Sequence, residues 1–305
     1  MCSFIGYDVA VLGAVGIDTN IYLPNGEIDF NVEANFSENL DYIGQAGGYA
    51  ARAYNSLGCK TAFIGFIGND PLGNFIKEQF KKDGIDISGM MIDPLGTKRS
   101  INFMDRNGNR KNFYDGKGSM TVEPEFMKCS EIIQKTRFAH VNIVNWTRYL
   151  LPMLKDRGVI IASDLQDVVD PEDEYRCDYI QNSDYLFFSA VNFPDPQELI
   201  QSFLEKNNDL RIICGRGGEG CIYADKDGRK YFPAVEINRP VVDTNGAGDS
   251  LAAGFLSSYL LEGYSIEDAI LRGQIAARYC CSIKANTDDL INRFQLNKYF
   301  DQLSS

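Results

Sequence analysis

The part of the chain richest in groups that could do chemistry is residues 241–255, which read VVDTNGAGDSLAAGF. Asp243 and Asp249 flank a run of small residues, and a segment typical of a helix follows. Gly246 and Gly248 can adopt backbone angles that other residues avoid, so consecutive N–H groups can converge on an anion. A helix starting near Asp249 would add its dipole at the same point. The pattern predicts a phosphate site at which Asp249 accepts the proton of an attacking hydroxyl.

A simpler interpretation of Asp249 is a helix N-cap, a position that aspartate favours. For an isolated Gly-Asp pair before a helix, the N-cap would be the better interpretation. Here the two flanking glycines, the second aspartate and the small-residue helix favour the catalytic one.

A second glycine-rich stretch, residues 215–220, satisfies the pattern GxGxxG after the apolar run RIICG. A dinucleotide fingerprint must open a helix, so that the pyrophosphate meets the N-terminus of that helix. The residues that follow, CIYADKDGRKYF, read as two strand-like arms around a turn. The glycines are therefore expected to join strand to strand. The phosphate-binding pattern GxxxxGK[ST] is absent, which argues against a P-loop nucleotidase.

The segments that must position these groups alternate between apolar strand-like runs and helix-like stretches. In the segment 71–84, PLGNFIKEQFKKDG, Phe75, Ile76 and Phe80 recur at helical spacing and Gly84 supplies a stop. Continuous apolar strands joined by crossover helices predict an α/β fold with a parallel sheet covered on both faces. The strand-like runs are YDVAVLG, TAFIGFIG, FAHVNIV, GVIIASDL, DYLFFSA and DLRIICG.

Two stretches break this alternation. Residues 19–43 alternate around Ile28, Phe30 and Val32 as half-buried strands do, and residues 99–115 contain Ile101, Phe103 and an Asn-Gly hairpin turn. Together they predict a small antiparallel flap, about residues 19–43 and 97–116, beside the main sheet. The flap is expected to be a lid or a homodimer surface. No linker, repeat or low-complexity segment is present, so residues 1–305 are expected to form a single domain.

Composition excludes several classes of function. The formal charge of −12 argues against binding of nucleic acid or anionic membranes, since both require a basic surface. The chain contains no apolar run of 18 residues, and its first residues read as a strand and not as a signal peptide. The eight cysteines form no CxxC pair, and several lie in apolar runs, which favours a reduced, cytoplasmic protein.

The chain has a single histidine, His140, within the strand-like run RFAHVNIV. There is consequently no HExxH pattern and no site with two histidine ligands. A structural role is the better interpretation of His140 than a catalytic one.

The sequence VVDTNGAGDSLAAGF resembles the C-terminal signature of the ribokinase-like (PfkB) family of sugar and nucleoside kinases. Residues 44–76, GQAGGYAARAYNSLGCKTAFIGFIGNDPLGNFI, resemble the N-terminal signature of that family, in the expected order and separation. The resemblance extends over essentially the whole chain. It implies a three-layer α/β/α sandwich with a mainly parallel sheet and a small β lid, and an enzyme that uses ATP and Mg²⁺.

The resemblance also implies roles for individual residues. Asp249 is the catalytic base, and Asp18, in GAVGID, anchors substrate hydroxyls. Phe103, in the flap, could stack on a base, cover a sugar ring or simply pack the lid. The backbone of the turn forms the anion hole, and paired glycines let the backbone approach the substrate; these residues are Asn245, Gly246, Ala247, Gly248, Gly47 and Gly48.

On the nucleotide side, the resemblance implies contacts from Gly217 and Gly220, with the adenine near Ala285 and Asn286. Family members often hold a monovalent cation such as K⁺ beside the anion hole. That cation would involve Asp243 and the Asn245 carbonyl, although Asp243 could instead brace the turn.

Three positions depart from the family pattern. Arg52 stands where an asparagine usually binds the substrate, so it could bind an anionic substrate or pair with an acid on the helix. The motif NxxE is not found in clean form, which leaves Ser189, or Asn192 with Asp195, for nucleotide and metal positioning. Gly215 stands where a threonine is usual.

Two classes of function fit these observations. The first is an ATP-dependent kinase that phosphorylates a hydroxymethyl group of a sugar, a sugar derivative or a nucleoside. The second is a non-catalytic regulator that keeps the fold and binds such a ligand. The retained Asp249 favours the enzyme, because a binding protein has no need of a base there.

Overall fold

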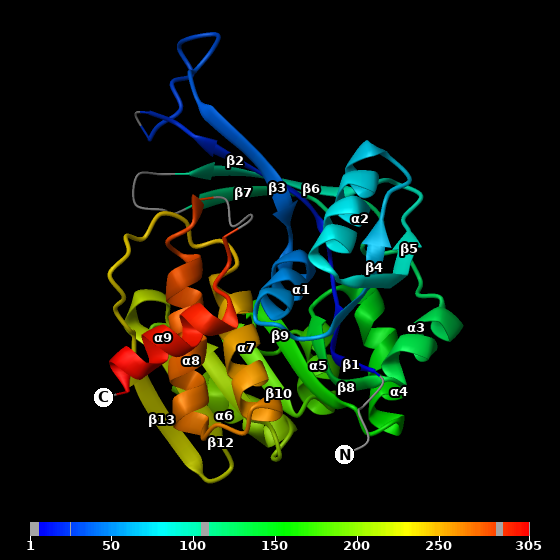
Figure 1. Ribbon diagram of the computed structural model, residues 1–305, viewed down its shortest axis with the longest axis vertical. Helices are drawn as coiled ribbons and strands as arrows, with labels where there is room; N and C mark the ends of the chain where they lie inside the picture. Colours follow the sequence, from blue (N-terminus) through cyan, green and yellow to red (C-terminus); the bar gives the residue numbers. More distant parts are fainter. Residues whose placement is uncertain (1–5, 25, 105–109, 285–288, 305) are drawn as a thin grey trace.

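The computed structural model describes residues 6–24, 26–104, 110–284 and 289–304. A nine-stranded sheet runs through its centre in the order β13-β12-β11-β10-β9-β8-β1-β4-β5 (Figure 1). The strands from β11 to β5 pair in parallel, and the pairs β11–β12 and β12–β13 are antiparallel. The strands are β1 (Tyr7–Leu12), β4 (Thr61–Ile67), β5 (Asp86–Ile92), β8 (Thr136–Asn142), β9 (Ile160–Asp167), β10 (Tyr185–Ser189), β11 (Arg211–Gly215), β12 (Gly220–Asp225) and β13 (Gly228–Pro233).

Helices cover both faces of this sheet, which gives three layers (Figure 1). Successive strand side chains point to opposite faces, so Val9 and Val11 pack in one core while Ala10 and Leu12 pack in the other. The first core includes side chains of α1 (Ala46–Ser56), α2 (Pro71–Asp83), α7 (Ala247–Leu256), α8 (Ile266–Cys280) and α9 (Arg293–Leu303); the second includes those of α3 (Phe126–Ile133), α4 (Leu151–Asp156), α5 (Glu174–Asn182) and α6 (Gln197–Lys206).

Helix α2 shows how local chemistry sets the bounds of an element. The Asp70 side chain caps its N-terminus by accepting a hydrogen bond from the Gly73 N–H, and Gly84 ends it with φ of 84°. Ile76 and Phe80 are buried as the helical spacing predicts. Phe75 does not belong to this buried face, because its side chain is 47% exposed.

A second, four-stranded sheet stands beside the first at the top of Figure 1, and we call it the lid. Its strands, in the order β3-β2-β6-β7, are β2 (Gly16–Tyr22), β3 (Glu38–Gly44), β6 (Lys98–Met104) and β7 (Arg110–Asp115). The expectation of a wholly antiparallel flap was wrong, because β2 and β6 pair in parallel. These two strands come from separate segments, so no hairpin turn constrains their direction.

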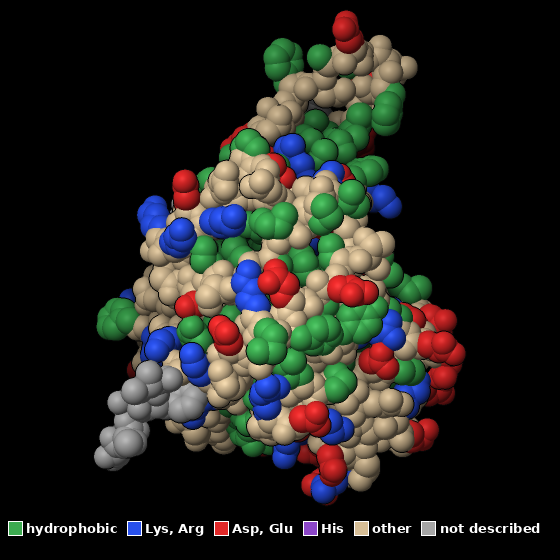
Figure 2. All heavy atoms as spheres, turned by 90° about the vertical axis from the view of Figure 1, so that its right-hand side faces the viewer, with side chains coloured by type: hydrophobic (Ala, Val, Ile, Leu, Met, Phe, Trp, Pro, Cys, Tyr) green, Lys and Arg blue, Asp and Glu red, His purple; other side chains and the backbone are tan. Residues whose placement is uncertain are grey.

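The segment between β2 and β3 does not continue the strands, contrary to the alternation around Ile28, Phe30 and Val32. All three side chains are exposed, Phe30 by 87%. Asp29 and Asn35 instead hydrogen-bond to backbone groups of this segment, which competes with strand pairing. Apolar side chains gather on the projecting lid (Figure 2), where the sequence predicts a dimer surface; that dimer stays a prediction. The Asn-Gly turn at 107–108 lies outside the described residues.

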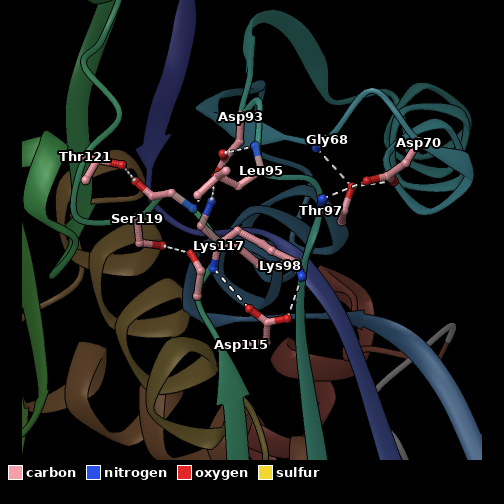
Figure 3. A network of polar contacts seen from close by, with 12 residues as sticks. Gly68, Asp70, Asp93, Leu95, Thr97, Lys98, Asp115, Lys117, Ser119 and Thr121 are labelled. Atoms are coloured by element: carbon pink, nitrogen blue, oxygen red, sulfur yellow. Dashed lines mark hydrogen bonds and ion pairs between the residues drawn. The ribbon is translucent and has the colours of Figure 1, made fainter.

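A polar network holds the base of the lid, where β6 begins and β7 ends (Figure 3). The Asp70 carboxylate accepts hydrogen bonds from the Thr97 N–H (2.7 Å) and hydroxyl (2.7 Å), which ties α2 to the residue before β6. Lys98, the first residue of β6, is buried with its Nζ 3.6 Å from an oxygen of Asp93. The Asp93 carboxylate also accepts from the Gly118 N–H at 2.9 Å. The lid is thus joined to the body where β6 begins and just after β7 ends.

The cysteines in the described part of the chain, Cys59 to Cys281, are free thiols. Within the described residues, no helix has the length and apolar character needed to cross a membrane.

Candidate active site

The turn that contains DTNGAGD leads directly into α7. Gly246 is the N-cap, with φ of 74°, a left-handed conformation that favours glycine. Asp249 therefore lies in the first turn of the helix, and the interpretation of Asp249 as an N-cap was wrong. Gly248 does not adopt a left-handed conformation; a side chain there would point into open space.

The expected anion hole is smaller than the resemblance implies. The Asn245 N–H donates to Asp243 Oδ1 at 2.9 Å, so it already has a partner inside the protein. The Ala247 N–H makes a long bond, 3.4 Å, to the Thr244 carbonyl. Among the described residues, the Gly246 and Gly248 N–H groups have no such acceptor and remain available at the helix start. The anion hole stays a prediction, and the N–H of Asn245 is the group of the four that is already engaged within the protein.

The Asp249 side chain is 8% exposed, and its Oδ1 has no hydrogen-bond partner among the described residues. Ligand atoms of Asp249, Asp164 and His140 all lie within 4.8 Å of one another. Burial raises the pKa of Asp249 well above its ordinary value, and the charge of Asp164 raises it further. Burial also raises the pKa of Asp164. The site therefore contains a carboxylate that holds protons more tightly than a free aspartate does.

His140 lies in β8, fully buried beside this pair of acids. The Tyr54 hydroxyl is 3.0 Å from His140 Nδ1, and the Asn142 amide is 3.3 Å from Nε2. Burial lowers the pKa of His140 to about 3, so the imidazole is neutral at physiological pH. His140 adds no positive charge to the site, and both ring nitrogens have polar neighbours.

Asp18 lies in lid strand β2 and is also buried. Its carboxylate accepts hydrogen bonds from Gln45 Nε2 (2.6 Å) and from the Tyr49 hydroxyl (2.6 Å). Burial raises the pKa of Asp18, and these hydrogen bonds oppose the increase. Gly44 lies opposite Gly16, and a Cβ at Gly44 would collide with the Asp18 carboxylate. The side chain is thus held in one orientation.

Gly47 and Gly48 lie inside α1 and not in a turn before it. A Cβ at Gly47 would come within 2.6 Å of the Ala14 carbonyl oxygen, and the Gly48 N–H donates to the same oxygen at 3.2 Å. These glycines let α1 approach the connection between β1 and β2, and so bring Tyr49 to Asp18.

Arg52 is buried, and its Nε donates to Asp83 at 2.8 Å. Asp83 is the last residue of α2, so the acid belongs to the neighbouring helix. Of the two alternatives for Arg52, this geometry favours pairing with an acid over binding an anionic substrate.

On the nucleotide side, the sheet register places Ser189 directly opposite Gly215. Gly217 and Gly220 follow in the short connection to β12, with φ of 56° and 110°. β11 and β12 are antiparallel, which confirms that these glycines join strand to strand. Ala285 and Asn286 lie outside the described residues.

Asn192 and Asp195, considered for metal positioning, have other partners. The Asn192 amide donates to the Val168 carbonyl at 2.9 Å, and Asp195 Oδ1 accepts from the Gln197 N–H at the start of α6. These contacts stabilise the loop between β10 and α6.

Phe103 lies in lid strand β6, and its ring packs edge-on against that of Phe113, with 5.7 Å between the ring centroids. It lines a groove of about 310 Å³ together with Leu23, Gly26, Ile28, Met104, Arg110 and Lys111. The charge of Arg110 lowers the pKa of Asp18 and of Asp249, against the larger effect of burial. Arg110 therefore lies within electrostatic reach of both acids as well as beside the groove.

Comparison with known proteins decides the family. The model of the pfkB family carbohydrate kinases matches residues 8–290. The chain belongs to this family of carbohydrate kinases. The predicted family, the fold class and the assignment as a kinase are thereby confirmed.

Individual relatives of this carbohydrate kinase point in the same direction. An acarbose 7(IV)-phosphotransferase of Actinoplanes sp. is 28% identical over 95% of this chain and 97% of its own. A 5-dehydro-2-deoxygluconokinase of Geobacillus thermodenitrificans is 25% identical over 87% and 86%. The structure of a microbiome-derived acarbose kinase superposes with a TM-score of 0.88 at 27% identity, covering 97% of this chain and 99% of that one.

The structure adds residues that the sequence analysis of this kinase missed. Asp164 lies beside Asp249, and Tyr49 and Gln45 donate hydrogen bonds to Asp18. Asn20 donates to Asp243. Of these four residues, only Asp164 stands in a sequence pattern from which its place in the site could have been predicted. It follows the buried run IIAS in a parallel strand, and ligands bind beyond the carboxyl ends of such strands.

Proposed function

We propose that this kinase transfers the γ-phosphoryl group of ATP to a hydroxymethyl group of a sugar or sugar derivative, with Asp249 as the general base. The observation that carries the proposal is the buried Oδ1 of Asp249 in the first turn of α7, which has no hydrogen-bond partner in the part of the chain that the structure describes. A buried carboxylate oxygen without a donor costs free energy unless a ligand supplies a hydroxyl proton. The raised pKa makes Asp249 a stronger proton acceptor than an ordinary aspartate.

The acceptor hydroxyl would be placed by Asp18. A carboxylate held by Gln45 and Tyr49 keeps lone pairs for two neighbouring hydroxyls, as a polyol requires. The acids around the site, and the pairing of Arg52 with Asp83, favour a neutral acceptor over an anionic one. The relatives named for acarbose and for 5-dehydro-2-deoxygluconate support a sugar-like acceptor.

The transferring phosphoryl group would be bound at the start of α7. The N–H groups of Gly246 and Gly248, which have no acceptor among the residues described, and the helix dipole would stabilise negative charge on its oxygens. Little covalent chemistry is needed from the protein in phosphoryl transfer, so positioning and charge stabilisation carry most of the rate. The lid would cover the site and exclude water, which otherwise competes with the sugar for the phosphoryl group.

Mg²⁺ would enter with ATP and neutralise charge on its phosphates. Mg²⁺ prefers oxygen ligands and is usually held by one or two carboxylates besides phosphates and water. Asp164 fits this preference, because its carboxylate lies within 4.8 Å of that of the base. Asn192 and Asp195 do not fit, since both side chains are engaged by the backbone of loops.

For Asp243 we propose the bracing role and not that of a K⁺ ligand. The carboxylate accepts from both the N–H and the amide of Asn245, which folds the turn back on itself. Activity is therefore expected without added K⁺.

The test is coupled ADP release with Mg²⁺ across neutral sugars, acidic sugars, sugar phosphates, nucleosides and acarbose-type oligosaccharides. Asp249→Asn is assayed in parallel, because it keeps the shape of the side chain and loses the base. A neutral sugar that supports turnover in the parent and loses about 10²–10⁴-fold in kcat with Asp249→Asn supports the proposal. Full activity of Asp249→Asn would overturn the assignment of the base. Ligands that raise Tm without any turnover would favour the non-catalytic regulator.

A further inference from the structure

Asn20, in lid strand β2, is completely buried and uses all of its hydrogen-bonding capacity. Its Nδ2 donates to Asp243 Oδ2 at 2.8 Å and to the Tyr22 hydroxyl at 2.9 Å. Its Oδ1 accepts from the Tyr42 hydroxyl and from Asn102 Nδ2, each at 2.9 Å. Because an amide has two N–H donors and one oxygen with two lone pairs, this environment fixes its orientation.

The lid side of this network is a row of asparagines. The sheet register places Asn20 opposite Asn102, and Asn102 opposite Asn112, so the three lie side by side on β2, β6 and β7. Asn112 Nδ2 donates to Asn102 Oδ1 at 2.8 Å. The orientation of Asn20 is therefore supported across the width of the lid.

The other side of the network is the turn before α7. Asp243 is completely buried, and it accepts from the Asn245 N–H at 2.9 Å and from the Asn245 amide at 2.8 Å. Asp243 thus determines where the turn lies relative to Gly246, the N-cap of α7. Tyr22 adds a weaker contact, 3.3 Å, from its hydroxyl to Asp243 Oδ2. Two residues of β2 therefore contact a carboxylate more than 200 positions away in the sequence.

Asn20 is also connected to the acceptor side of the site. Asp18 precedes it by two positions on β2, so both side chains lie on the same face of the lid. Tyr49 donates to Asp18 at 2.6 Å and lies 3.2 Å from the Tyr42 hydroxyl, which in turn donates to Asn20. A series of polar contacts thus runs from Asp18 to Asp243, although the two tyrosine protons go to Asp18 and Asn20 and the two hydroxyl oxygens only lie near each other.

We propose that Asn20 is a positioning residue for the phosphoryl-binding turn. Its hydrogen bond to Asp243 holds that turn in position when lid strand β2, which also carries Asp18, is in place. The inference rests on the proposed function, since it takes Asp18 as the acceptor anchor and the Gly246–Gly248 N–H groups as the phosphoryl site. When an acceptor orders β2, the amide of Asn20 holds Asp243 and the turn that follows. When β2 is displaced, Asp243 loses a donor in a buried place, which a carboxylate tolerates poorly.

The test exchanges the residue types of the hydrogen-bonded pair Asn20 and Asp243. Asn20→Asp keeps the oxygen that accepts from Tyr42 and Asn102 and places a carboxylate against Asp243. Asp243→Asn removes the carboxylate and supplies an amide. The double variant Asn20→Asp/Asp243→Asn restores an amide–carboxylate hydrogen bond with the roles reversed. All three are nearly isosteric and are assayed as full-length protein, with thermal melts to establish folding.

We expect each single variant to lose about 10–100-fold in kcat, the effect of one hydrogen bond to a charged group, with KM for ATP changed less than about threefold. The double variant is expected to recover most of the lost kcat, because the effects of substitutions at two residues in contact are not additive. A double variant whose loss equals the product of the two single losses would overturn the proposal. So would an unchanged kcat in Asn20→Asp.

Asn207→Asp serves as the matched control. Asn207 Nδ2 donates to the carbonyls of Ile180 and Ser183, each at 2.9 Å, at the end of α6. This variant also exchanges a donating amide for a carboxylate, and it should lower Tm without lowering kcat. Asp249→Asn separates the two proposals: its activity tests the base alone, whereas recovery in the exchanged pair tests the link between Asn20 and Asp243.

Discussion

The carboxylates of Asp164 and Asp249 lie within 4.8 Å of each other in the interior of the protein, although 85 positions separate them in the sequence. Asp164 comes from the carboxyl half of β9 and Asp249 from the first turn of α7. Two buried like charges at this separation cannot both ionise easily. The pair therefore retains protons at pH values at which free aspartates have lost theirs.

Asp164→Asn is expected to move the pH dependence of the reaction. The charge of Asp164 raises the pKa of Asp249 in addition to burial, so its removal lowers that pKa. A general base works deprotonated, and activity falls as the pH drops through its pKa. The acid limb of kcat/KM should therefore shift to lower pH, by about one unit.

The measurement for Asp164→Asn is a pH profile of kcat/KM at saturating Mg²⁺, which keeps any change in metal affinity from distorting the limb. Asp167→Asn is the control, since Asp167 ends the same strand with an exposed side chain. An acid limb that stays in place in Asp164→Asn would show that the two carboxylates do not share a titration.

Tyr49→Phe is expected to weaken acceptor binding and leave ATP binding unchanged. The variant removes the 2.6 Å hydrogen bond to Asp18 and leaves Gln45 alone to orient the carboxylate. A hydrogen bond to a charged group contributes about 1.5–3 kcal/mol, so kcat/KM for the sugar should fall about 10-fold or more.

Steady-state kinetics with each substrate varied in turn check the Tyr49→Phe prediction. Tyr7→Phe is a matched control, because the Tyr7 hydroxyl donates to Asp86 at 2.8 Å on another part of the sheet. If KM for ATP rises as much as KM for the sugar, Tyr49 does not act through the acceptor.

Arg52→Ala is expected to affect stability and not substrate choice. The change removes a hydrogen-bonded partner of Asp83 and should lower the free energy of unfolding by about 2 kcal/mol. Because the guanidinium pairs with Asp83, KM for a neutral sugar and for its acidic counterpart should change by the same factor. A selective rise in KM for the acidic sugar would contradict this prediction and indicate that Arg52 binds the substrate.

Gly246→Ala is expected to lower both stability and kcat. Gly246 has φ of 74°, and an alanine there is strained by about 1 kcal/mol or more. The strain falls on the turn that presents the N–H groups to the phosphoryl group, so kcat should drop as well.

Gly84→Ala provides the comparison for Gly246→Ala. Gly84 has φ of 84° at the end of α2, and a Cβ there meets no atom within 4 Å. Gly84→Ala should lose a similar amount of free energy of unfolding, measured by chemical denaturation, and keep an unchanged kcat. An equal kcat in Gly246→Ala and the parent would contradict a role of this turn in phosphoryl transfer.

Local sequence patterns were sufficient for the main elements of the fold. The apolar runs correctly predicted the parallel strands, and Gly84 correctly predicted the end of α2. The prediction of strands around Phe30 was wrong, and Phe75 is exposed despite its helical spacing, because periodicity within a segment does not show whether another element covers it. In the lid, side-chain hydrogen bonds of Asp29 and Asn35 replaced strand pairing.

By itself the sequence determined the family, the kinase chemistry and the position of the turn with Asp243 and Asp249. These conclusions depend on residue types within two contiguous motifs and on their order, which the chain already shows. Only the tertiary structure decided which partner each polar group has: Asp83 for Arg52, Asp243 for the Asn245 N–H and Asn20 for Asp243. The physical reason is that a buried hydrogen bond depends on distance and orientation in space, and the packing of sheet, helices and lid sets both for residues far apart in the chain.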